Sequence, residues 1–290
     1  MNKLFIVLSC AFFVLFAACP SAARDSASEK FTFETGIDHV FQAGIKGTDT
    51  KVSSTRYGIK GSYSYFTLAY NYTDFSWSRA GDSGLSAPGR TPWKGLHDIS
   101  LGARKNFFLN RQWMLTLGAG LDSAFEKEIS DSAGAWTRIG LTRIFDNGWS
   151  AGIGVFGLYH PVGSMVLPSI ALGYAPTGDQ GFSARIGFPA TEVRYGFNER
   201  LAARAYSGYT VRVYRLKNSS PVQEKGYFSQ RAMRLGMEME VKPVPSMTLA
   251  FGPYYLMDRQ WRTYSKNNSR VDREKVKDSA GVRLDISWKF

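Results

Sequence analysis

Apolar residues alternate with polar or small ones along most of the chain after Glu29. The pattern is clearest in the last eleven residues, AGVRLDISWKF, where Val282, Leu284, Ile286, Trp288 and Phe290 share one parity. The positions between them are polar or small. Because successive side chains of a strand point to opposite faces, this stretch predicts a β-strand with one wholly apolar face.

The same period of two recurs throughout, bounded by Gly, Pro, Asn, Asp or Ser, and no stretch of twelve residues shows the helical period. One parity is apolar and the other is small or charged, as Leu117 and Leu121 opposite Gly118 and Asp122 illustrate. This pattern predicts an all-β fold, a closed antiparallel transmembrane β-barrel whose apolar side chains meet lipid. The predicted strands are 30–43, 52–62, 65–77, 95–107, 112–125, 135–145, 149–160, 165–175, 181–188, 191–198, 201–215, 227–242, 247–263 and 276–290.

The strand count depends on Pro189, where the apolar parity switches from even to odd positions. A turn there gives fourteen strands with short and long connections in alternation, whereas a bulge gives an odd number that single-chain bacterial barrels do not have. We expect fourteen strands, with twelve as the alternative. Because the two strands beside Pro189 are short, the extracellular rim should dip between Tyr159 and Val193. This dip is interpreted either as a lateral opening to the membrane or as a low rim shielded by lipopolysaccharide.

The tryptophans fall near predicted strand ends, which suggests two aromatic belts at the membrane interfaces. The predicted periplasmic belt contains Trp113, Trp149 and Trp288, together with Phe107, Phe145 and Phe290. The predicted extracellular belt contains Trp77, Trp93, Trp136 and Trp261.

The N-terminus predicts secretion. Lys3 precedes an apolar run from Leu4 to Ala18, and small residues follow, so residues 1–23 are interpreted as a signal peptide and 24–290 as one barrel domain. A lipoprotein site at Cys19 is the alternative. Cys10 and Cys19 are the only cysteines, so we expect a barrel without disulfides. The signal and the barrel together predict the outer membrane of a Gram-negative bacterium.

Charge indicates which partners to expect. The formal net charge is +12, and a secreted basic chain meets lipopolysaccharide phosphates or anionic solutes rather than nucleic acid. The expected partners are outer-membrane lipid and lipopolysaccharide, the barrel insertion machinery and a small-molecule solute, with no nucleic acid.

Inward positions carry many charges, which we interpret as a selectivity surface. This surface supports a channel or transporter that favours anions, or a closed barrel held by ion pairs whose extracellular loops act as an adhesin or receptor. The predicted lumen-lining residues are Arg104, Arg138, Arg185, Arg194, Arg204, Arg212, Arg234, Arg283, Asp122, Glu238 and Asp285.

No enzymatic chemistry is predicted. The three histidines, His39, His97 and His160, lack a suitably placed partner in sequence, although His160 near Ser164 leaves a rim hydrolase as a third hypothesis. No cofactor is expected, and scattered histidines give no metal-ligand spacing.

Two stretches resemble known outer-membrane proteins. The final strand resembles the closing strand of Gram-negative barrels, so Val282, Leu284, Ile286, Trp288 and Phe290 are interpreted as the membrane insertion signal. The segment 166–216 resembles a group of uncharacterised outer-membrane proteins in its Phe188-Pro189 step, its Tyr195–Asn198 turn and its Tyr214–Leu216 ending. Fourteen strands are also similar to the fatty-acid and phenol-pathway transporters, which implies a porin-like role in moving hydrophobic solutes. We expect no N-terminal hatch like that of the fatty-acid transporters, because about six residues separate the predicted cleavage site from the first strand.

Overall fold

The computed structural model describes residues 31–83, 85–86, 89–176 and 180–290, which are almost entirely β-strand. The predicted signal peptide, residues 1–23, lies outside these residues. A 3-10 turn, η1 (Ala80–Asp82), is the helical segment described, and it is far too short to cross a membrane. The strands are β1 (Thr32–Gly44), β2 (Lys51–Tyr63), β3 (Phe66–Ser78), β4 (Gly95–Phe108), β5 (Trp113–Phe125), β6 (Ala133–Ile144), β7 (Trp149–Tyr159), β8 (Met165–Tyr174), β9 (Gly181–Phe188), β10 (Ala190–Gly196), β11 (Leu201–Arg215), β12 (Tyr227–Val244), β13 (Met247–Tyr264), β14 (Arg270–Lys275) and β15 (Ser279–Lys289).

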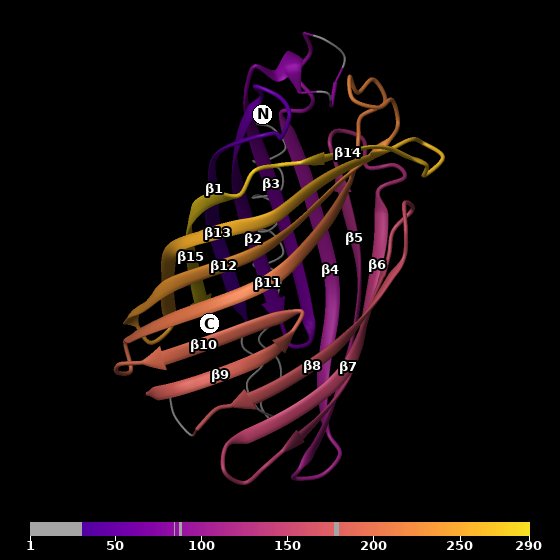
Figure 1. Ribbon diagram of the computed structural model, residues 1–290. Coiled ribbons are helices and arrows are strands. Elements are labelled where there is room, and N and C mark those ends of the chain that lie inside the picture. Colours follow the sequence, from indigo (N-terminus) through magenta and orange to yellow (C-terminus); the bar gives the residue numbers. More distant parts are fainter. Residues whose placement is uncertain (1–30, 84, 87–88, 177–179) are drawn as a thin grey trace.

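Fourteen of these strands close into an antiparallel barrel (Figure 1). Each of β1 to β13 pairs with its successor, and β15 pairs with both β13 and β1. At the closing seam Phe33 lies opposite Trp288, and the Phe290 amide donates to the Phe31 carbonyl at 2.8 Å. The predicted fold class and the fourteen strands are confirmed.

The turn at Pro189 is also confirmed, because β9 ends at Phe188 and β10 begins at Ala190. One prediction was wrong: 264–275 was expected to be a loop, yet β14 extends the pairing of β13 there. The residues of β14 are nearly all charged, so they carry no apolar alternation, and the overhanging end of β13 supplies the pairing instead.

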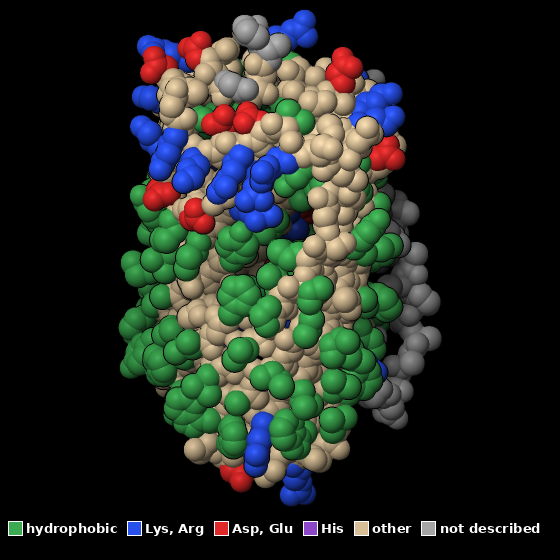
Figure 2. All heavy atoms as spheres, turned by 45° about the vertical axis from the view of Figure 1, so that its right-hand side comes forward, with side chains coloured by type: hydrophobic (Ala, Val, Ile, Leu, Met, Phe, Trp, Pro, Cys, Tyr) green, Lys and Arg blue, Asp and Glu red, His purple; other side chains and the backbone are tan. Residues whose placement is uncertain are grey.

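The outer face of the barrel is apolar. Ile153, Leu121 and Met237 lie on the face that the sequence predicts to be apolar. These residues are 67%, 65% and 65% exposed, so no other described part of the protein covers them. On the face shown in Figure 2, side chains of this kind form a broad hydrophobic band across the wall. Lipid covers such a band, so this is a barrel of the outer-membrane type.

The wall is interrupted above the β9–β10 hairpin. Pairing of β8 with β9 covers Ile170–Tyr174, which leaves Met165–Ser169 without a strand neighbour on that side in the described chain. On the opposite side, β11 pairs with β10 as far as Gly208. Beyond that point β11 runs on against β12 and meets β5, where Arg215 lies opposite Phe125. We call the gap between Met165–Ser169, Pro189 and Thr210–Tyr214 the β8–β11 window.

Aromatic side chains close the extracellular mouth. Trp93 is 1% exposed and contacts Phe228, Trp77 and Trp261 with ring centroids 4.1, 5.5 and 5.8 Å apart. The Trp77 indole N–H donates to the Trp93 carbonyl at 2.7 Å. We call this group, with Phe75, Tyr214, Leu96 and the other buried apolar residues around it, the aromatic cap.

The predicted extracellular aromatic belt was therefore wrong. Trp77, Trp93 and Trp261 pack inside the mouth, and Trp136 lies against Gly102 and Gly120 on the inner wall. Nearness to a strand end does not determine which face an indole occupies. At the periplasmic end, Trp149 and Phe290 are exposed at 41% and 69%, as an interfacial belt requires.

Candidate functional site

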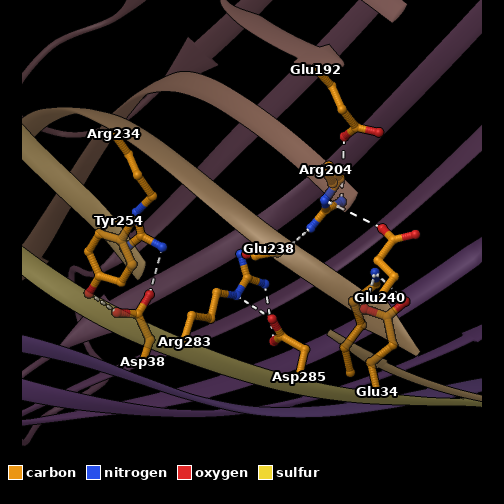
Figure 3. Close-up of polar contacts among 11 residues, drawn as sticks. Glu34, Asp38, Glu192, Arg204, Arg234, Glu238, Glu240, Tyr254, Arg283 and Asp285 are labelled. Atoms are coloured by element: carbon orange, nitrogen blue, oxygen red, sulfur yellow. Dashed lines mark hydrogen bonds and ion pairs between the residues drawn. The ribbon is translucent and has the colours of Figure 1, made fainter. Parts of the chain in front are cut away.

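One side of the lumen is a network of ion pairs, shown in Figure 3. We call it the ion-pair wall; its residues come from β1, β2, β10, β11, β12, β13 and β15. Arg234 pairs with Asp38 at 2.7 Å, and the Tyr254 hydroxyl donates to the same carboxylate. Arg283 pairs with Asp285. Lys60 reaches Glu34 at 2.9 Å.

Arg204 is the centre of this wall. Its guanidinium pairs with Glu238 and lies 3.5 Å from both Glu192 and Glu240. Arg194 holds Glu240 from the next strand at 2.8 Å. The Glu238 side chain has no exposed surface, so its charge depends on Arg204 for compensation.

The opposite side of the lumen, formed by β4 to β9, carries arginines of another kind. Arg104, Arg138 and Arg185 have no ion pair within the described part of the chain. Around them the wall is made of small inward residues, including Gly140, Gly152 and the hydroxyl-bearing Thr116. We call Arg104, Arg138 and Arg185 the free-arginine track.

Two cavities meet at this track. The upper one, of about 550 Å³, lies beneath the aromatic cap, and the lower one, of about 320 Å³, extends along β5 to β9. Arg104 and Arg138 line both cavities, and Arg185 lines the lower one. A third cavity, of about 270 Å³, lies along β1 to β4 beside the ion-pair wall.

The charge of the upper cavity is strongly unbalanced. Seven arginines and two aspartates line it. Asp38 is committed to Arg234, and Arg212 is held at 3.1 Å by Asp98 from outside the lining. Asp122 makes no ion pair in the described residues, so the cavity keeps an excess of positive charge.

The residues predicted to line the lumen thus separate into two groups. Six charged residues of the ion-pair wall neutralise one another and their neighbours, whereas the free-arginine track and Asp122 face open space. The paired group is Arg194, Arg204, Arg234, Arg283, Glu238 and Asp285, with Arg212 paired to Asp98 nearer the cap. Sequence periodicity predicted their parity but could not distinguish the groups.

One lumenal arginine, Arg259, was missed because an irregularity in β13 reverses the parity of that strand. The register of β12 and β13 shifts between Arg231 and Met233, and Asp258 takes a left-handed conformation with φ of 49°. An extra residue in one strand turns the following side chains to the other face. The sequence did contain a sign of this bulge, because Asp258 and Arg259 interrupt the apolar alternation of the strand. Aspartate is also one of the residues that adopts the left-handed conformation more readily than most.

The histidines make no contact of hydrolase type. His39 bonds Thr55 and His97 bonds the Tyr70 hydroxyl, each through Nδ1 at 2.9 Å. His160, buried in the β7–β8 connection, accepts the Val162 amide at 3.4 Å and packs edge-on against Tyr227. Within the described chain no group of acidic or histidine side chains is arranged to hold a metal ion.

The predicted insertion signal lies on the outer face. Val282, Leu284 and Phe290 are 45%, 42% and 69% exposed, while Ile286 and Trp288 are partly covered. Their role in insertion stays a prediction.

No protein-family model and no curated protein matches this chain. Outer-membrane channels are among the solved structures that resemble it. The NanC porin superposes with a TM-score of 0.38 at 12% identity, covering 90% of this chain and 100% of that one. An outer-membrane channel from Pseudomonas putida F1 gives a TM-score of 0.37 at 8% identity, with 94% and 100% covered. The Pseudomonas putida toluene transporter TodX gives 0.35 at 10% identity, with 91% and 90% covered. Similarity this distant carries no argument about the solute.

Proposed function

We propose that this barrel carries a small anionic solute across the outer membrane along the free-arginine track. The observation behind the proposal is that Arg104 and Arg138 line two adjoining cavities and have no carboxylate partner among the described residues. An uncompensated charge inside a membrane protein is costly unless water or a counter-ion reaches it. A row of such groups favours the entry of anions.

The ion-pair wall supports this role by remaining neutral. Arg204, Arg234 and Arg283 are each held by carboxylates, so they keep the shape of the barrel and contribute little net field. Part of the residual positive charge then lies on the other side of the lumen, on the free-arginine track. A solute with a carboxylate, phosphate or sulfate group fits the planar guanidinium donors.

The aromatic cap determines how the proposal is tested. Because Trp93 fills the mouth, we expect low conductance from the wild-type barrel in planar bilayers. Trp93→Ala should open the mouth and give stable unitary steps that select chloride over potassium. If Trp93→Ala disturbs folding, Trp93→Leu provides a milder opening.

Selectivity then tests the track itself. Adding Arg104→Gln and Arg138→Gln to the opened barrel should move the reversal potential toward the non-selective value. The matched control removes two arginines from the extracellular β3–β4 loop, with Arg79→Gln and Arg90→Gln, and should leave selectivity unchanged. If both pairs of substitutions shifted the reversal potential equally, anion selectivity would not depend on the free-arginine track. An opened barrel without conductance would instead support the closed barrel that acts through its loops.

A further inference from the structure

The edges of the β8–β11 window expose backbone that the wall leaves unpaired. Met165–Ser169 of β8 and Thr210–Tyr214 of β11 have a strand neighbour on one side only among the described residues. Unpaired backbone is not tolerated against lipid, but it is tolerated where it lines a water-filled cavity. Pro168 lies in the unpaired half of β8 and has no N–H to satisfy, as is usual for proline at a sheet edge.

A comparable gap elsewhere in the wall is filled. On the β13–β1 side, β15 pairs with β13 only up to Leu256, and β14 continues the pairing above it. Val276 then bridges to Ile45, and the Lys277 amide donates to the Gly44 carbonyl at 2.8 Å. No described segment takes this role between β8 and β11.

The window opens at the depth of the hydrocarbon layer. Val166 and Ile170 on one side are 73% and 62% exposed, and Phe188 below is 45% exposed. These are lipid-facing side chains of the outer band. On the face shown in Figure 2, a recess lies among apolar side chains and beneath a group of Lys and Arg, with basic atoms in its depth.

Behind the window the surroundings change from apolar to cationic. Met165, Leu167 and Val211 belong to the edges of the window and line the upper cavity, which Arg104 and Arg138 line as well. The aromatic cap closes the route upward. A molecule entering from the membrane would therefore keep its apolar part at the window and bring a charged group to the track.

We propose that the β8–β11 window is a lateral port for a single-chain amphipathic anion. The charged group binds Arg104 and Arg138, and the apolar chain passes between β8 and β11 into the outer half of the membrane. This inference rests on the proposed anion path and adds to it the class of solute and the direction of its entry.

Cysteine labelling in lipid vesicles tests the port. The barrel domain has no cysteine of its own, since Cys10 and Cys19 both precede it. Leu167→Cys reports on the window, because its side chain lines the upper cavity. Val211→Cys, on the outward parity of β11 at the other edge, is the positive control for labelling from lipid. Ala69→Cys is the matched control, because Ala69 lines the cavity of β1 to β4 behind a fully paired stretch of wall.

A lipid-dissolved reagent, dodecylmaleimide, should label both window cysteines and leave Ala69→Cys unreacted. A small water-soluble thiosulfonate should label Ala69→Cys from the lumen, which shows that the control is folded and reactive. Decyl sulfate should protect Leu167→Cys at a concentration about tenfold below that of decyl maltoside, because it alone gains charge-assisted hydrogen bonds. Arg104→Gln with Arg138→Gln should abolish this difference.

Three outcomes would overturn the proposal. Failure of dodecylmaleimide to label Leu167→Cys while it labels Val211→Cys means that the port is closed to lipid, whereas anion-selective conductance of the opened barrel would still support the proposed function. Equal protection by the two amphiphiles would contradict the anionic class. Protection that survives loss of both arginines would place the charged group elsewhere.

Discussion

The Tyr209 amide donates a hydrogen bond to the Pro189 carbonyl at 3.2 Å, and this bond marks the height at which the wall ends between β10 and β11. It attaches the tip of the β9–β10 hairpin to a strand that continues upward without it. The lower edge of the β8–β11 window is thus set by backbone geometry. Its sides are set by how far β8 and β11 extend beyond the tip.

Glu238→Gln should destabilise the barrel by about 3 kcal/mol, the cost of removing one partner from a buried ion pair. The Glu238 side chain is fully buried against Arg204, which would keep only the two carboxylates at 3.5 Å. Urea unfolding in lipid vesicles measures the change. Glu34→Gln is the control, because Glu34 and Lys60 are 39% and 42% exposed, and such pairs contribute less than about 1 kcal/mol. Equal losses for both variants would contradict the central role of Arg204.

Asp258→Val should cost about 1–2 kcal/mol, since a β-branched residue is strained in the left-handed conformation. Asp258 has φ of 49°, and Arg259 and Trp261 point inward beyond it. Asp258→Gly should be tolerated, because glycine adopts this conformation freely. The unfolding midpoints of the two variants provide the comparison. A valine variant as stable as wild type would mean that the bulge can relax to regular pairing.

His160 should make stability depend on pH. Burial in the β7–β8 connection lowers its pKa to about 4, from an ordinary value near 6.5. The unfolded chain therefore binds the extra proton first as pH falls, and stability is lost between about pH 6.5 and pH 4. From pH 7.5 to pH 5 the loss should be about 2 kcal/mol. His160→Gln should remove this part of the pH dependence, and an unchanged profile of the unfolding free energy would contradict it.

Ile153→Arg tests the assignment of the lipid face. Ile153 lies midway along β7 and is 67% exposed, so an arginine there should cost about 2–4 kcal/mol. Thr142→Arg on neighbouring β6 points into the lower cavity and should cost less than about 1 kcal/mol. Folding yield and urea midpoint in vesicles report both. A larger loss of stability for Thr142→Arg than for Ile153→Arg would mean that the lipid-facing and lumen-facing sides of the wall are assigned the wrong way round.

Much of this architecture could be predicted from local pattern. The parity of Leu117, Ile153 and Val282 followed from alternation, and Pro189 marked the turn that made the strands fourteen. The orientation of Trp261 did not follow, because the bulge at Asp258 reverses parity within a single strand. Nor did the burial of Trp93, since its partners Phe228 and Trp261 lie far along the chain.

The sequence by itself determined the barrel, its two faces and most of the charges inside it, because side-chain alternation is a property of each regular strand alone. Only the tertiary structure decided which arginines are neutralised and where the wall opens. The Tyr254 hydroxyl and Asp38 meet from 216 residues apart, and β11 joins β5 across the mouth. Contacts of that range depend on the cross-section of the closed barrel, and a periodic pattern along one strand carries no information about it.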